Sequence, residues 1–152
     1  MNNIRESEIQ KFKETLICSL KLLGITLTDT QCEIIDCGCP HKTDILPDNK
    51  MGIYSFFYKG KCLKIGKAGT KSKARYNSQH YNPDSSKSNL AKSIITDTTF
   101  PVKNLDNNNV GDWIKQNTQR INILIDNNSG KFLLNYIESF MQLYYKPKYE
   151  GS

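Results

Sequence analysis

The first hydrophobic pattern in the chain has the spacing of a helix. Apolar side chains recur every three or four residues at Ile9, Phe12, Leu16, Leu20 and Leu23. This period predicts an amphipathic helix over residues 7–23, with one face packed against the rest of the chain. Residues 25–50 have no such period, and we interpret them as a mixed connector.

The pattern changes at Gly52, where a run of β-forming residues begins. Residues 52–58 read Gly-Ile-Tyr-Ser-Phe-Phe-Tyr, and a second apolar run at 62–65 follows across the turn Lys59-Gly60-Lys61. Two such runs joined by a glycine-containing turn predict a β-hairpin.

The rest of the chain predicts one further strand and several helices. Helices are expected over about 72–81, 88–95, a short piece from 113, and 130–145, with a buried strand over 120–126. We therefore expect an α/β protein of the α+β class. It would consist of an N-terminal helical extension and connector at 1–49 and a main domain at 50–152.

Composition excludes several classes of protein. The chain has 152 residues, of which 38% are hydrophobic, which suits one domain with a core and is too apolar for a disordered chain. No apolar run reaches the ~18 residues of a membrane span, so we expect no membrane partner. The odd number of cysteines and the absence of a signal-peptide pattern favour reduced thiols and a cytoplasmic location.

The positive charge is concentrated in one segment. The formal net charge is +6, yet residues 49–83 contain eight basic residues and no acidic one. These are Lys50, Lys59, Lys61, Lys64, Lys67, Lys71, Lys73 and Arg75. Aromatic residues are interleaved with them, a composition that favours a nucleic-acid backbone as partner. The alternative is a solvated face beside a hydrophobic strand.

Four features, in this order, resemble the GIY-YIG nuclease superfamily. They are Gly52-Ile53-Tyr54, the segment Lys64-Ile65-Gly66-Lys67-Ala68, Arg75, and Glu138 in a late helix. The resemblance covers about residues 50–150 and implies a small three-stranded antiparallel sheet flanked by helices. It also implies cleavage of DNA with a divalent metal, Mg²⁺ or Mn²⁺, held largely by Glu138.

The chain departs from the family pattern at three positions. Lys64 stands where most members have tyrosine, as in some restriction-endonuclease-like members, which favours a restriction or defence role. Gln79 stands where histidine or tyrosine is usual, so that role would pass to the neighbouring His80. Glu150 lies where members often have asparagine.

The hairpin residues suggest proton transfer. Tyr54 and Lys64 lie on partner strands, which can bring their side chains together on one face. A neighbouring ammonium favours tyrosinate, so we expect Tyr54 to act as general base or proton relay, tuned by Lys64. The alternative is that Tyr54 is an ordinary half-buried strand aromatic.

The other basic residues are expected to contact phosphate. Arg75 has a planar fork suited to a phosphate on which charge develops, with a surface or structural ion pair as the alternative role. Lys67 follows Gly66 and would position backbone phosphate. Non-specific electrostatic contacts are assigned to Lys59, Lys61, Lys71 and Lys73.

Glu138 is the expected metal ligand. It lies in a helix that is apolar nearly all round, where an ionised carboxylate is costly unless paired or bound to metal. One carboxylate with waters and substrate oxygens is a common way to hold Mg²⁺. The alternative is a structural Glu138–Arg75 ion pair.

Two histidine-containing features leave alternatives open. His80 could assist proton transfer because its ordinary pKa is near neutrality, or it could cap a helix end. Four candidate zinc ligands lie close in sequence, at Cys32, Cys37, Cys39 and His41, but their spacing lacks the paired C-x₂₋₄-C pattern of structural zinc sites.

These observations predict a metal-dependent endonuclease that hydrolyses duplex DNA, with a homodimer as one way to cut both strands. Two alternatives remain. One is a catalytically inactive nucleic-acid binding module on the same scaffold. The other is an RNA nuclease, since the residues do not say whether the sugar 2′-hydroxyl is read.

Overall fold

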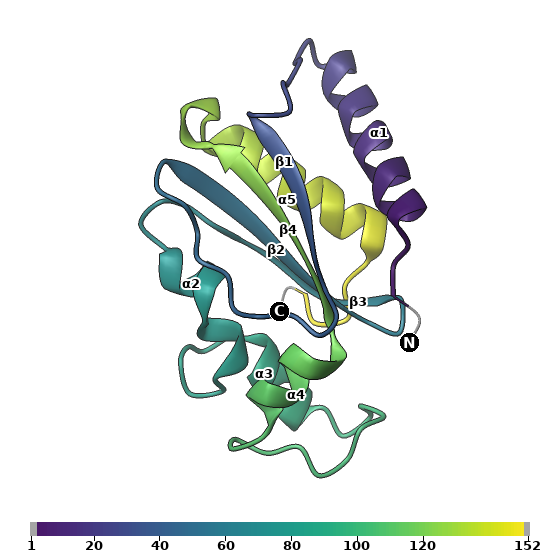
Figure 1. The fold of residues 1–152 in the computed structure, drawn as a ribbon, viewed down its shortest axis with the longest axis vertical. Coiled ribbons are helices and arrows are strands. Elements are labelled where there is room, and N and C mark those ends of the chain that lie inside the picture. Colours follow the sequence, from purple (N-terminus) through teal and green to yellow (C-terminus); the bar gives the residue numbers. More distant parts are fainter. Residues whose placement is uncertain (1–2, 151–152) are drawn as a thin grey trace.

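A computed structural model describes residues 3–150 of the chain (Figure 1). Its strands are β1 (Cys32–Gly38), β2 (Lys50–Tyr58), β3 (Lys61–Ala68) and β4 (Gln119–Asp126). Its helices are α1 (Glu6–Leu22), α2 (Lys73–Asn77), α3 (Leu90–Thr96), α4 (Val110–Asn117) and α5 (Lys131–Tyr145), with single 3₁₀ turns at Gln79–Tyr81 and Asn127–Ser129. None of these helices is long and apolar enough to cross a membrane.

The strands form one antiparallel sheet in the order β1-β4-β2-β3. The predicted hairpin is confirmed as β2 and β3, and the predicted third strand as β4. The prediction of three strands is wrong, because β1 lies within residues 25–50, the expected connector. Ile34 and Ile35 are adjacent in β1 and pack against opposite faces of the sheet, so the strand has no alternating pattern.

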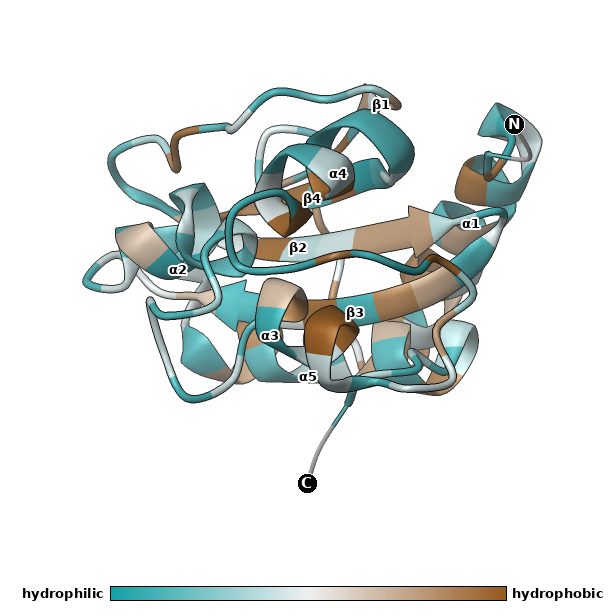
Figure 2. Ribbon diagram, turned by 90° about the horizontal axis from the view of Figure 1, so that it is seen from below, coloured by the Kyte–Doolittle hydropathy of each residue, from teal (hydrophilic) through white to brown (hydrophobic). Residues whose placement is uncertain are grey.

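The sheet has a hydrophobic cluster on each face. On one face, α1 and α5 pack over Met51, Ile53 and Phe57 of β2. On the other face, α2, α3 and α4 pack around Tyr54 and Phe56. The strongest concentration of hydrophobic residues lies in the strands between these layers (Figure 2). Because β2 is covered on both faces, its residues from Met51 to Phe57 are all buried.

The N-terminal region is part of this architecture. Helix α1 contributes Phe12, Leu16 and Leu20 to the same cluster as β2 and α5, and β1 pairs with β4 over most of its length. The boundary expected between residues 49 and 50 therefore lies between β1 and β2, which belong to one sheet.

The outer edge of β3 is covered by the end of the chain. The backbone N–H groups of Lys148 and Tyr149 donate to the carbonyls of Cys62 and Leu63, at 3.0 and 2.8 Å. One residue further, the Glu150 carboxylate accepts a hydrogen bond of 2.8 Å from the Ile65 N–H. The segment 148–150 thus satisfies backbone groups that an edge strand would otherwise leave open.

Candidate functional site

Tyr54 lies across Gly66, its partner residue on β3. A Cβ atom at Gly66 would collide with the hydroxyl and ring of Tyr54, so only glycine allows the side chain to cross the strand there. Tyr54 is 2% exposed, and its hydroxyl has no hydrogen-bond partner within residues 3–150. In that part of the chain only His80 has a fully buried unpartnered polar atom, so the Tyr54 hydroxyl keeps contact with solvent.

The charges around Tyr54 come from three distant parts of the sequence. Burial raises the pKa of Tyr54 well above its ordinary value of about 10. The Arg75 guanidinium acts in the opposite direction, while the carboxylates of Glu138 and Glu150 add to the rise of this pKa. Arg75 and Glu138 therefore both lie within electrostatic reach of the Tyr54 hydroxyl. The direction of the pKa shift is opposite to the one expected from a neighbouring lysine, and Tyr54 is a protonated phenol at neutral pH.

Lys64 lies on the same face as Tyr54, opposite Phe56 in the register. It is only 8% exposed, and its Nζ donates to the Tyr149 carbonyl at 3.3 Å. Lys64 also acts on two neighbouring groups. It contributes to the lowered pKa of His80, and it opposes the rise that burial causes in the pKa of Glu150. Its environment is therefore the C-terminal segment and His80 rather than the Tyr54 hydroxyl.

Arg75 lies in α2, directly after the loop that leaves β3. Its side chain is exposed, and within residues 3–150 it has no hydrogen-bond or ion-pair partner. The alternative Glu138–Arg75 ion pair is therefore not formed. An exposed, unpaired guanidinium near Tyr54 is free to bind an anion.

Glu138 pairs with Lys67 instead. The Lys67 ammonium lies 2.5 Å from Oε2 of Glu138, whose side chain is 14% exposed. Lys67 is opposite Ile53 and shares its face, which α5 covers, so the strand register directs Lys67 toward the helix. The lysine expected to position phosphate thus neutralises the expected metal ligand.

His80 is enclosed beside Tyr54. Its ring centroid lies 4.4 Å from that of Tyr54, and its Nδ1 accepts a hydrogen bond of 3.2 Å from the Leu90 N–H. Burial, reinforced by Lys64, Arg120 and Arg75, lowers the pKa of His80 to about 3. The neutral ring therefore carries its proton on Nε2, which is buried without a partner. In this arrangement His80 holds the Tyr54 ring and has no free lone pair with which to accept a proton.

Glu150 is a second carboxylate at the site, to which the sequence analysis assigned no catalytic role. Its Oε1 accepts from the Ile65 N–H, and its Oε2 accepts from Nε2 of Gln142 at 3.0 Å. Burial raises its pKa, an effect that hydrogen bonding and Lys64 oppose and Glu138 strengthens. The signal in the sequence was the residue's place in the family pattern, where asparagine is usual.

A polar groove of about 670 Å³ opens beside Lys64. Its lining includes three lysines that sequence reasoning did not select, Lys87, Lys92 and Lys148, together with Glu150. Lys87 and Lys92 lie near α3, whereas Lys148 lies in the C-terminal segment. Neither segment has an excess of positive charge in the sequence that would predict a shared basic groove. The groove extends the positive surface of β3 toward α3.

The remaining expected phosphate contacts are spread along the hairpin and the following loop. Lys59, Lys61 and Lys71 are exposed, whereas Lys73 forms an ion pair with Asp48. Lys59 and Lys61 lie at the hairpin turn, at the opposite end of β3 from Lys71. The basic residues are therefore spread along β3 rather than gathered in one cluster, and Lys64 and Lys67 lie on opposite faces of the sheet.

The four candidate zinc ligands do not converge. Within residues 3–150 there is no group of three or more His, Cys, Asp or Glu side chains arranged to hold a metal ion. His41 has both ring nitrogens engaged, with the Thr118 carbonyl at 2.8 Å and the Tyr81 hydroxyl at 2.9 Å.

A Mg²⁺ or Mn²⁺ ion at Glu138 would need most of its ligands from substrate and water, because neither Glu138 nor Glu150 belongs to a group of three or more possible metal ligands within residues 3–150. Glu138 already holds a cation, the Lys67 ammonium, and Glu150 lies near enough to influence the same tyrosine. Mg²⁺ is commonly held by one or two carboxylates plus phosphate oxygens. Glu138 would be the ligand, and Lys67 would have to move away from it.

No protein-family model, no curated protein and no solved structure matches this chain.

Proposed function

We propose that this chain is a metal-dependent endonuclease of the GIY-YIG type that hydrolyses DNA phosphodiester bonds. The supporting observation is that Arg75 from α2 and Glu138 from α5 both act electrostatically on the Tyr54 hydroxyl of β2. A guanidinium, a carboxylate and a solvent-contacting phenol near one another can bind phosphate, stabilise charge and transfer a proton during phosphodiester hydrolysis.

In the proposed reaction, water adds to phosphorus and the bond to the leaving sugar oxygen breaks. Tyr54 keeps its proton at neutral pH, so it acts as a relay. It accepts a proton from the attacking water while its own proton passes to the solvent that its hydroxyl contacts, and the departing sugar oxygen takes up a proton from solvent. Arg75 binds the phosphate oxygens through its planar fork. Lys64 adds positive charge, and His80 positions the Tyr54 ring by packing against it at an interplanar angle of 46°. A bound Mg²⁺ or Mn²⁺ would supply Lewis-acid stabilisation of phosphate charge.

The test is nicking of supercoiled plasmid in Mg²⁺ and Mn²⁺, with gel shift as the binding measurement. We expect the wild type to nick DNA and Glu138→Gln to lose nicking while it still shifts the plasmid. Glu33→Gln, which changes an exposed carboxylate on β1, is the matched control and should nick like the wild type. A parallel RNA panel separates DNA from RNA cleavage.

A catalytically inactive nucleic-acid binding module is the second candidate. The observation that favours it is the Lys67–Glu138 ion pair, which occupies the carboxylate that a metal would need. If the wild type shifts plasmid on a gel but leaves DNA and RNA intact in both metals, this second function replaces the first.

A further inference from the structure

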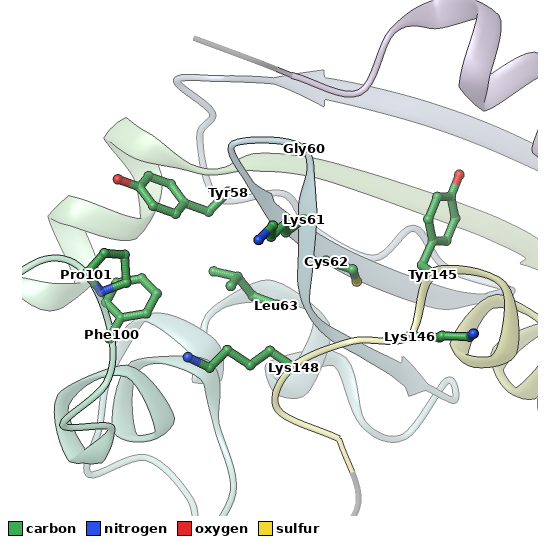
Figure 3. A pocket seen from close by; sticks show the side chains of 10 residues that line it. All are labelled: Tyr58, Gly60, Lys61, Cys62, Leu63, Phe100, Pro101, Tyr145, Lys146 and Lys148. Carbon is green, nitrogen blue, oxygen red and sulfur yellow. The ribbon is translucent and has the colours of Figure 1, made fainter.

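A second depression, of about 500 Å³, lies at the hairpin end of β3. Figure 3 shows Tyr58, Lys61 and Leu63 from the hairpin facing Phe100 and Pro101 from the loop after α3. This volume falls within the range of pockets that hold small ligands. None of the expected catalytic residues lines it.

The wall of this pocket is aromatic and well supported. The ring centroids of Tyr58 and Phe100 are 5.9 Å apart, and Trp113 packs against both, at 5.2 and 5.5 Å. Phe100 is 2% exposed, whereas Tyr58 is half-buried and lines the pocket, with the Lys59 ammonium 5.3 Å from its ring centroid. A fixed aromatic face of this kind is a platform for stacking a planar ring.

The charge of the lining is positive. Lys61, Lys146 and Lys148 contribute to it, and the lining has no acidic side chain. Lys148 pairs with Asp97 at 2.6 Å, outside the lining, whereas Lys61 and Lys146 have no ion pair within residues 3–150. A ligand that combines a planar apolar ring with negative charge matches this surface in both respects.

The pocket adjoins the polar groove beside Lys64. Lys148 lines both this pocket and the groove that contains Lys64. From Lys61 to Lys67 the chain runs six residues along β3, about 20 Å at the usual rise of a strand. A nucleic-acid strand that lies in the pocket would have to extend by this distance to reach Lys67 at the other end of β3.

We propose that this pocket binds one unpaired nucleotide of a nucleic-acid strand, with its base against Tyr58 and its phosphate at Lys61 and Lys146. This inference rests on the proposed nuclease function, whose substrate it defines more closely. A base inside a duplex has both faces covered by its neighbours, so the pocket selects single-stranded or locally opened sites.

The test is binding without catalysis, by fluorescence anisotropy of a labelled decathymidylate and of a blunt duplex in EDTA. Tyr58→Leu keeps apolar volume but removes the stacking ring, and we expect about tenfold weaker decathymidylate binding with little change for the duplex. The double variant Lys61→Ala/Lys146→Ala, which changes only exposed residues, should also weaken decathymidylate binding. Phe132→Leu and Lys42→Ala, both exposed and outside the pocket, are the matched controls.

The outcomes separate this inference from the proposed function. If Tyr58→Leu and the lysine variant bind decathymidylate like the wild type, the pocket assignment is overturned, even where the wild type cleaves DNA. Equal weakening of the duplex also overturns it. If both variants lose decathymidylate binding while the wild type cleaves nothing, the pocket assignment holds and the endonuclease proposal fails.

Discussion

The Lys67 ammonium lies 2.5 Å from the Glu138 carboxylate, and this contact joins the edge strand β3 to helix α5. The same carboxylate is the one to which we assign metal binding. A cation of the protein and a divalent metal would therefore compete for one group.

Removing this competitor should strengthen metal binding. We expect Lys67→Ala to bind Mn²⁺ about fivefold more tightly, which corresponds to loss of about 1 kcal/mol from a half-exposed pair. The measurement is calorimetric titration of Mn²⁺, with Lys71→Ala as a control that removes an exposed lysine. Equal Mn²⁺ affinities in the two variants would show that Lys67 does not compete with the metal for Glu138.

Tyr54→Phe should lower turnover without unfolding the protein. The hydroxyl has no hydrogen-bond partner within the described residues, so we expect the free energy of unfolding to change by less than about 1 kcal/mol. Loss of a proton relay should slow nicking about 100-fold. Tyr136→Phe on α5 is the control, and unchanged nicking in Tyr54→Phe contradicts the relay role.

Gly66→Ala should destabilise the fold through Tyr54. The added Cβ would collide with the hydroxyl and ring of Tyr54, which we expect to cost about 1–3 kcal/mol in urea denaturation. The same substitution in a Tyr54→Ala background should cost less, because the obstructing ring is gone. Gly69→Ala, where a Cβ meets open space, is the control. Equal costs in both backgrounds would mean that Gly66 serves another purpose.

Stability should fall as the pH is lowered from about 6.5 toward 4. Burial, chiefly, lowers the pKa of His80 to about 3 and that of His41 to about 4, against about 6.5 in an unfolded chain. In this range the unfolded chain binds protons that the folded chain does not, so the free energy of unfolding decreases with falling pH. Two such histidines give a slope of up to about 2.7 kcal/mol per pH unit.

The measurement for this pH dependence is urea denaturation between pH 4.5 and 7. His80→Gln should lower the slope of unfolding free energy against pH by about 1.4 kcal/mol per pH unit, because His41 is then the only histidine that contributes. An identical slope in wild type and variant contradicts the assignment of His80 as a buried neutral group.

Arg120 should be essential to the sheet face that carries Tyr54. It is fully buried and donates to Asn122 Oδ1, the Tyr81 hydroxyl and the Tyr76 carbonyl at 2.6–2.9 Å. Arg120→Leu leaves these acceptors without a donor, and we expect a loss of about 3 kcal/mol or more of unfolding free energy. Arg75→Leu, an exposed arginine, should change it by less than about 0.5 kcal/mol. Similar stabilities for the two variants would rule out this role for Arg120.

Much of the fold follows from local pattern. The β2–β3 hairpin, β4 and α5 are long, strongly apolar segments with clear ends, and the sequence predicts each of them within a few residues. Strand β1 was missed because its half-buried residues serve both faces of the sheet. Its pairing with β4 joins positions as distant as Cys32 and Ile125, which no local pattern records.

The candidate site was predictable in its members more than in its contacts. Arg75 and Glu138 each act electrostatically on the Tyr54 hydroxyl, but the partner of Glu138 is Lys67 rather than Arg75. That choice depends on which helix covers which face of β3. The enclosure of His80 likewise depends on packing between α3 and β2. An exposed histidine could accept a proton near neutral pH, whereas the enclosed His80 ring cannot.

The C-terminal segment along β3 also determines how two copies of the protein could assemble. Its hydrogen bonds to Cys62, Leu63 and Ile65 occupy the positions that a strand from a neighbouring molecule would use to extend the sheet. Growth of the sheet past β3 is thereby blocked. A second copy that extends the sheet would have to pair with β1, the strand at the opposite edge.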